Sequence, residues 1–283
     1  MTDLDGDLAA LARARLRHAR AANSPGLARL AIRLAETQQS LTPTARPRRL
    51  LVFGAEGVSL PAAEATETQA VLVAGGEADA SDTGACPSRA VLGRFATNVS
   101  VGARAAEEAA EAGVRVLALL ASLTAQEVAA AEALVALLVP AAAEEVVSQA
   151  AEGGKAERSR RLAWLEERVR AADANPDRMQ AIAALCPAPV AALAGAIVEA
   201  RRAPLSVVIE GLSGAAAALV AREIDASSLD GLIPLLPRPQ HPAQRLALRA
   251  LGLEPFDLAG ESADPLPALL ALLDAAAARL ASA

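Results

Sequence analysis

The sequence has 283 residues, of which 53% are hydrophobic and 21% charged, and this length and composition suit one large domain. A formal net charge of -6 and an aromatic content of 1% argue against a basic surface facing phosphates and against a stacking platform for bases. The N-terminus begins with acidic residues and has no apolar core, so we predict no signal peptide and expect a cytoplasmic protein that binds neither nucleic acid nor a membrane.

The first half of the chain predicts helices separated by two buried strands. Ser24-Pro25-Gly26 precedes apolar residues at helical spacing, which is typical of a helix start. Residues 54 to 88 are rich in Gly, Ala, Ser, Thr and acidic residues without strong periodicity, and we predict mostly loop there. In chain order the predicted elements are a helix to about residue 39, a strand at 50–53, a helix at 104–112, a strand at 114–119 and a helix at 125–138.

The stretch from Val116 to Ala143 is apolar enough to suggest a membrane span. Glu127 and Glu132 interrupt it, and many of its residues are weakly hydrophobic alanines. It therefore predicts a buried or half-buried helix. Cys86 and Cys186 lie far apart and form no CxxC pair, which predicts reduced structural thiols and neither a metal site nor a cofactor.

The second half predicts more helices and two further strands. Gly153-Gly154 breaks the chain before a helix rich in Arg and Glu. The apolar run at 205–209 predicts a buried strand, whereas Pro234 confines the strand at 232–236 to a sheet edge or to a loop. Six helices are predicted here. The first contains Trp164 and ends at residue 172, and the others cover 175–185, 189–200, 211–222, 244–251 and 264 to the C-terminus.

Alternating strands and helices predict an α/β fold with a parallel sheet covered by helices on both faces, a three-layer Rossmann-like arrangement. We expect a single domain over 1–283, with a small helical subdomain made of about 1–40 and 265–283. Sites in such sheets lie beyond the carboxyl ends of the strands, so the loops after Phe53, Leu119, Ile209 and Leu236 are the candidate site.

Three segments carry a resemblance to one family of enzymes. Residues 24–30, SPGLARL, are similar to the family motif PGSLGRLE. Residues 209–221, IEGLSGAAAALVA, are similar to the motif DGFxxxAAALVA, and residues 251–255 match the motif LGLEP. These motifs belong to the nicotinate-nucleotide:dimethylbenzimidazole phosphoribosyltransferases, which make the α-ribazole phosphate used for the lower ligand of cobalamin. The match at 209–221 is the most specific, and the resemblance spans nearly the whole chain.

The resemblance also implies site residues. AEG at 55–57 stands where the family has ADHG, and AGESA at 259–263 resembles GEGTGA, whose Glu is the proposed general base, after a segment that is missing here. Glu261 is therefore the implied catalytic residue. The other implied site residues are Glu56, Gly57, Gly75, Gly76, Thr97, Asn98, Lys155, Glu210, Gly211 and His241. From the residues alone, Glu261 and Lys155 also fit solvent-facing side chains, Glu56 fits a helix-end cap, and His241 fits a surface residue at a helix start.

The signature loop of the family, GEMGIGNTT, reads LASLTAQEV at 120–128. No glycine lies between residues 114 and 152, so backbone amides have little freedom to approach a phosphate. Thr124 and Glu127 have the spacing of a capping box, in which a hydroxyl and a carboxylate occupy helix-end amides. The carboxylate would lie where a phosphate's charge belongs, and we predict that this helix end repels a nucleotide.

Three hypotheses for function follow. The chain is a diverged transferase that moves phosphoribose from nicotinate mononucleotide to a benzimidazole-like base, or it is a non-catalytic subunit or regulator that pairs with an intact homologue. The third hypothesis is a small-molecule sensor that has kept only the base pocket. The resemblance implies a dimer, with itself or with such a homologue.

Overall fold

A computed structural model describes residues 4–18, 25–54, 69–73, 89–147, 154–235, 241–256 and 265–282. Its centre is a five-stranded sheet with the order β2-β1-β3-β4-β5, in which every neighbouring pair is parallel. The predicted α/β fold with a parallel sheet is therefore confirmed. The strands are β1 Arg48–Phe53, β2 Gln69–Val73, β3 Val116–Ala121, β4 Ser206–Glu210 and β5 Leu232–Leu235.

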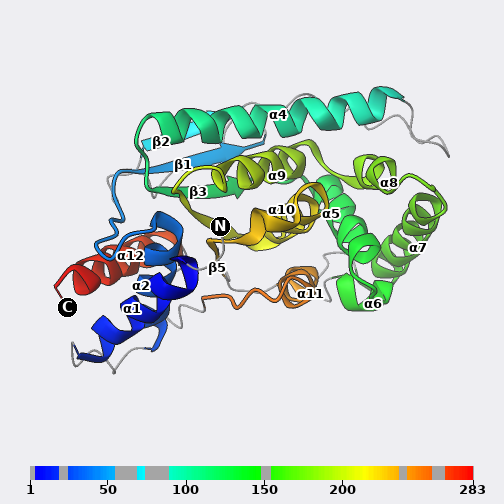
Figure 1. Cartoon of the computed structure of the whole chain (residues 1–283). Coiled ribbons are helices and arrows are strands. Elements are labelled where there is room, and N and C mark those ends of the chain that lie inside the picture. Colours follow the sequence, from blue (N-terminus) through cyan, green and yellow to red (C-terminus); the bar gives the residue numbers. More distant parts are fainter. Residues whose placement is uncertain are drawn as a thin grey trace.

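Helices connect and cover these strands (Figure 1). Within the described ranges, no helix combines the length and the apolar character needed to cross a bilayer. The helices are α1 Leu4–His18, α2 Pro25–Gln38, α4 Arg89–Glu111, α5 Ala125–Leu138, α6 Ala143–Val146, α7 Gly154–Asp173, α8 Arg178–Leu185, α9 Ala188–Ala200, α10 Gly211–Ile224, the 3-10 helix η1 Ala226–Leu229, α11 Pro242–Ala250 and α12 Pro265–Ala281.

The sheet separates two hydrophobic cores because successive side chains of a strand point to opposite faces. Leu51 and Phe53 of β1 belong to the core shared with α4, α5, α9 and α10. Leu50 and Val52 belong to the core shared with α1, α2 and α12. Figure 1 shows these last three helices, which come from both ends of the chain, gathered together beside the sheet. They form the third layer of the sandwich.

A buried arginine holds the C-terminal helix to the start of β1. The Arg48 side chain is 3% exposed; its guanidinium lies 3.0 Å from the Asp274 carboxylate of α12 and donates a hydrogen bond to Leu270 O at 3.2 Å. Arg46 contacts the same carboxylate at 3.0 Å. Burial alone would raise the pKa of Asp274, but the hydrogen bonds and charges of the two arginines outweigh it and lower this pKa.

The sequence-based prediction was wrong at the start of α4, and it did not include β2, α6 or a separate helix at α1. The strand β2 lies inside the segment 54–88 that we expected to be mostly loop. The α4 helix begins at Arg89, well before the predicted start at Arg104. Its first half contains Gly93, Thr97 and Asn98, which are poor helix formers in isolation, so tertiary packing overrides local propensity here. Pro234 does lie in an edge strand, as predicted.

That packing brings the backbones of α4 and α9 into direct contact. A methyl group added at Gly102 would lie 1.7 Å from Ala192 O, and one added at Gly195 would lie 1.9 Å from Val99 O. Each helix thus presents a glycine to a carbonyl of the other. The two glycines let the helices approach so closely that no side chain fits between them.

We predict that Gly102→Ala lowers the free energy of unfolding by about 2 kcal/mol or more, because the added methyl group forces α4 away from α9. Gly93→Ala, in the same helix, is the matched control, since Gly93 is exposed and a methyl group there meets nothing within 4 Å. The control should gain up to about 1 kcal/mol from helix propensity. Urea denaturation measures both, and equal effects would contradict the close-contact explanation.

Candidate functional site

Backbone contacts close the carboxyl edge of the sheet between β1 and β3. Ser122 N, just after β3, donates to Phe53 O at 3.0 Å. Gly54, just after β1, has a φ of 136°, and a methyl group at this position would lie 2.6 Å from Ser122 O. Only glycine tolerates that conformation and that approach. The chain segments that follow β1 and β3 are therefore in direct backbone contact at this edge.

The helix that follows β3 is capped by its own side chains. Thr124 N donates to Glu127 Oε2 at 2.8 Å, and Glu127 N donates to Thr124 Oγ1 at 3.3 Å, so the predicted capping box is present. Two backbone amides at the start of α5 are therefore already satisfied. The Glu127 carboxylate occupies the positive end of the helix dipole, where an incoming phosphate would otherwise be attracted.

The junction of β4 and α10 differs from that of β3 and α5. Glu210 is the N-cap residue of α10, but its side chain makes no capping hydrogen bond to the helix. Gly211 has a φ of 71°, and Gly214 lies against β4, where a methyl group would be 3.0 Å from the Ile209 Cβ atom. The first-turn amides of α10 thus reach the carboxyl edge without a side-chain cap.

A buried carboxylate joins three helices beside this edge. Glu132 of α5 has no exposed surface, and its Oε2 atom accepts from Arg161 Nε of α7 at 2.9 Å, with a second guanidinium nitrogen at 2.8 Å. His241 Nε2 lies 3.1 Å from Glu132 Oε1, although the contact is not aligned as a hydrogen bond. Glu132 therefore fixes the positions of α7 and α11 relative to α5.

His241 has a second structural role as the N-cap residue of α11. Its Nδ1 atom accepts a hydrogen bond from Ala243 N at 3.2 Å. Since Nδ1 accepts, the ring proton must lie on Nε2, the atom that faces Glu132. The helix start expected at His241 is confirmed, and its side chain is only 21% exposed.

Glu132 has a role that was not predicted from the sequence. The sequence nonetheless contained a sign of this role, namely an acidic residue within an otherwise apolar helix. Such a residue is buried only when it is paired. The partners could not be identified from the sequence. Arg161 lies in a helix with several arginines, and His241 lies far along the chain.

The implied site residues fall into two groups. Glu56, Gly57, Gly75, Gly76 and Glu261 lie outside the described residues, as does Cys86. Among the others, Thr97 is exposed on α4 and its hydroxyl donates to Gly93 O at 3.0 Å, whereas Asn98 is buried. Lys155 lies in the first turn of α7, and Glu210 and Gly211 lie at the carboxyl end of β4.

The remaining cysteine of the sequence, Cys186, follows α8 as its C-cap residue and is half-buried. Burial raises the pKa of the Cys186 thiol. A thiol that stays protonated is a poor nucleophile and a poor metal ligand. Its environment agrees with the structural role predicted for it.

Two of the segments that carry the family resemblance meet in space. The Arg29 guanidinium, on α2, lies 2.9 Å from the Glu254 carboxylate and also donates to Glu254 O at 3.2 Å. It lies over the Phe256 ring, 4.3 Å from the centroid. Phe256 N in turn donates to Pro234 O at 2.8 Å, which extends the edge of β5. The segments 24–30 and 251–255 therefore brace one another at the sheet edge.

Comparisons with known proteins agree with the fold. A phosphoribosyltransferase family model, DBI_PRT, matches residues 93–281, more than half of the chain. CobT from Thermus thermophilus is 24% identical and superposes with a TM-score of 0.76 over 97% of this chain and 96% of that one. A nicotinate-nucleotide-dimethylbenzimidazole phosphoribosyltransferase structure from the same organism is 25% identical, with a TM-score of 0.73 over 97% and 95%. Comparison with curated protein sequences gave no significant match.

We predict that Arg161→Met lowers the free energy of unfolding by about 3 kcal/mol, because Glu132 stays buried without its main counter-charge. The matched control is Arg160→Met in the same helix. Arg160 pairs with Glu157, but the Arg160 side chain is 77% exposed, so its loss should cost at most about 0.5 kcal/mol. Denaturant unfolding monitored by circular dichroism compares the two. If both variants were equally stable, Glu132 would not hold α7 in place.

Proposed function

This chain belongs to the DBI_PRT family of phosphoribosyltransferases, and we propose that it is a diverged member acting in the synthesis of the cobamide lower ligand in the cytoplasm. Its substrates are nicotinate mononucleotide and a benzimidazole-like base. The observation that carries this proposal is the family match over residues 93–281, which includes the β4–α10 junction with its Glu210-Gly211 pair. The fold shared with the two Thermus thermophilus proteins supports it.

The reaction requires the protein to position the two substrates and to supply one general base. An azole nitrogen attacks C1 of the ribose, the glycosidic bond to nicotinate breaks, and its electron pair stays on the pyridine nitrogen of the leaving nicotinate. The proton on the other ring nitrogen of the azole, which becomes acidic after the attack, must then be accepted. We assign that role to the Glu261 carboxylate, which follows Gly260 in the segment that resembles the GEGTGA motif.

We predict that pure protein incubated with nicotinate mononucleotide and dimethylbenzimidazole releases nicotinate, and that Glu261→Gln slows the release at least about 100-fold by removing the proton acceptor. Glu166→Gln is the matched control. Glu166 is exposed on α7 and has no ion pair within the described part of the chain, so this variant should keep its rate. Chromatography of free nicotinate provides the measurement, and an unchanged rate in Glu261→Gln would remove Glu261 from the mechanism.

The capping box of α5 favours a second candidate, a non-catalytic partner. Two amides of the signature loop, Thr124 N and Glu127 N, are occupied by side chains, and the Glu127 charge opposes a phosphate. A chain that binds nucleotide poorly can still pair with an intact homologue and change its rate or its choice of base. As a base-binding sensor, the same chain would bind dimethylbenzimidazole without any nucleotide.

For this second candidate we predict that calorimetry detects no binding of nicotinate mononucleotide to the chain alone, while mixing the chain with an intact homologue changes the rate of nicotinate release. Size-exclusion chromatography should show a mixed dimer rather than two homodimers. Calorimetry with dimethylbenzimidazole alone distinguishes the sensor. Release of nicotinate by the pure chain at about one per second, a rate typical of an enzyme, would contradict both non-catalytic roles.

A further inference from the structure

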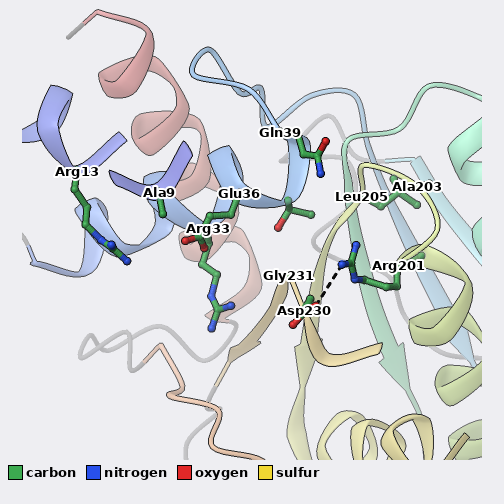
Figure 2. A pocket seen from close by; sticks show the side chains of 12 residues that line it. Ala9, Arg13, Arg33, Glu36, Gln39, Arg201, Ala203, Leu205, Asp230 and Gly231 are labelled. Carbon is green, nitrogen blue, oxygen red and sulfur yellow. Dashed lines mark ion pairs between the residues drawn. The ribbon is translucent and has the colours of Figure 1, made fainter. Parts of the chain in front are cut away.

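A cavity lies at the amino edge of the sheet, opposite the candidate active site. It has a volume of about 400 Å³ and is bounded by Leu205 and Gly231, which directly precede β4 and β5. Figure 2 shows α1 and α2 on one side of it and the end of α9 on the other. The cavity is thus formed by elements that are far apart in the sequence.

Three arginines line this cavity, and two of them have no partner among the described residues. Arg13 of α1 and Arg33 of α2 make no ion pair and no hydrogen bond there. Arg201, which follows α9, lies 3.3 Å from the Asp230 carboxylate, and the two side chains are 40% and 70% exposed. An exposed pair of this kind contributes little and breaks readily. Counting only the described residues, the cavity therefore contains two unpaired guanidinium groups that can bind an anion.

The same cavity contains oxygen acceptors. Glu36 of α2 lines it and has no ion pair in the described part of the chain, and Asp230 lies on the opposite wall (Figure 2). Thr37 Oγ1 is buried and has no hydrogen-bond partner among the described residues. Arginines beside carboxylates form a mixed surface that suits a ligand with both an anionic group and hydroxyls.

One wall of the cavity requires a glycine at position 231. Gly231 has a φ of 81°, and a methyl group there would lie 2.7 Å from Thr37 Oγ1. A side chain at this position would therefore be strained and would push α2 away from the start of β5. The geometry of the cavity depends on this close approach.

We propose that this cavity binds a phosphate monoester of a small hydroxylated molecule, such as a sugar phosphate. A phosphate monoester carries nearly two negative charges at neutral pH, which matches the two guanidinium groups of Arg13 and Arg33. Arginine donates paired hydrogen bonds to phosphate oxygens, and carboxylates such as Glu36 and Asp230 accept hydrogen bonds from hydroxyl groups. The volume of about 400 Å³ is in the range of small-molecule sites.

Bound there, such a ligand joins the terminal helices α1 and α2 to α9 and to the amino ends of β4 and β5. Because the unfolded chain has no such cavity, the ligand must stabilise the folded chain by mass action. This site takes no part in the transfer reaction. Nicotinate release therefore tests the proposed function separately from it.

The test is calorimetry of the full-length protein with glucose 6-phosphate, and with glucose and inorganic phosphate in parallel. We expect glucose 6-phosphate to bind more tightly than either comparison compound and to raise the melting temperature. Arg33→Gln and Arg13→Gln should each weaken this binding about tenfold or more, since each removes a charged hydrogen-bond donor. Neither arginine has a partner to lose within the described residues, so both variants should fold.

The matched control is Arg245→Gln on α11, an exposed arginine whose side chain has no partner within the described residues. This variant has the same change of net charge and should bind glucose 6-phosphate as the parent does. No binding at millimolar concentration would overturn the proposal. Equal weakening by all three variants would also overturn it, because that result indicates a general charge effect rather than this cavity.

Discussion

The carboxylate of Glu132, buried without any exposed surface, is the constraint around which the candidate site is arranged. An isolated charge in such a place would cost several kcal/mol, so Arg161 and His241 must be held next to it. That requirement positions α7, which carries Lys155, and α11, which begins just after His241. Lys155 and His241, which the family resemblance implies as site residues, therefore lie on or next to helices that Glu132 holds in place. Glu132 itself is not among the residues that the resemblance implies.

The carboxyl edge of the sheet has two helix starts with opposite properties. At α5, Thr124 and Glu127 satisfy the amides and place a negative charge at the helix end. At α10, the Glu210 side chain does not cap the helix, and the glycines at 211 and 214 allow a close turn after β4. The two helix starts at the same edge therefore differ in how they can receive an anion. The fold that supports both helices is kept.

Much of the fold followed from local pattern. Buried strands such as β4 are short apolar runs that end at a polar residue or glycine, and the α5 capping box is encoded in four consecutive residues. The α1 helix and β2 were missed because neither has a strong periodic signal of its own. The start of α4 was missed because Gly93, Thr97 and Asn98 have low helix propensity, which packing against α9 outweighs.

For this protein, the sequence alone was sufficient to predict the alternation of strands and helices, the edge position of the strand that contains Pro234, and the family. These features depend on neighbours within a few residues or on motifs read in line. Which side chains meet was decided by tertiary structure: Glu132 with Arg161 and His241, Arg29 with Glu254, and Arg13 with Arg33 and Arg201 around one cavity. Such groupings join residues far apart in the chain, and only the packing of the layers brings their side chains together.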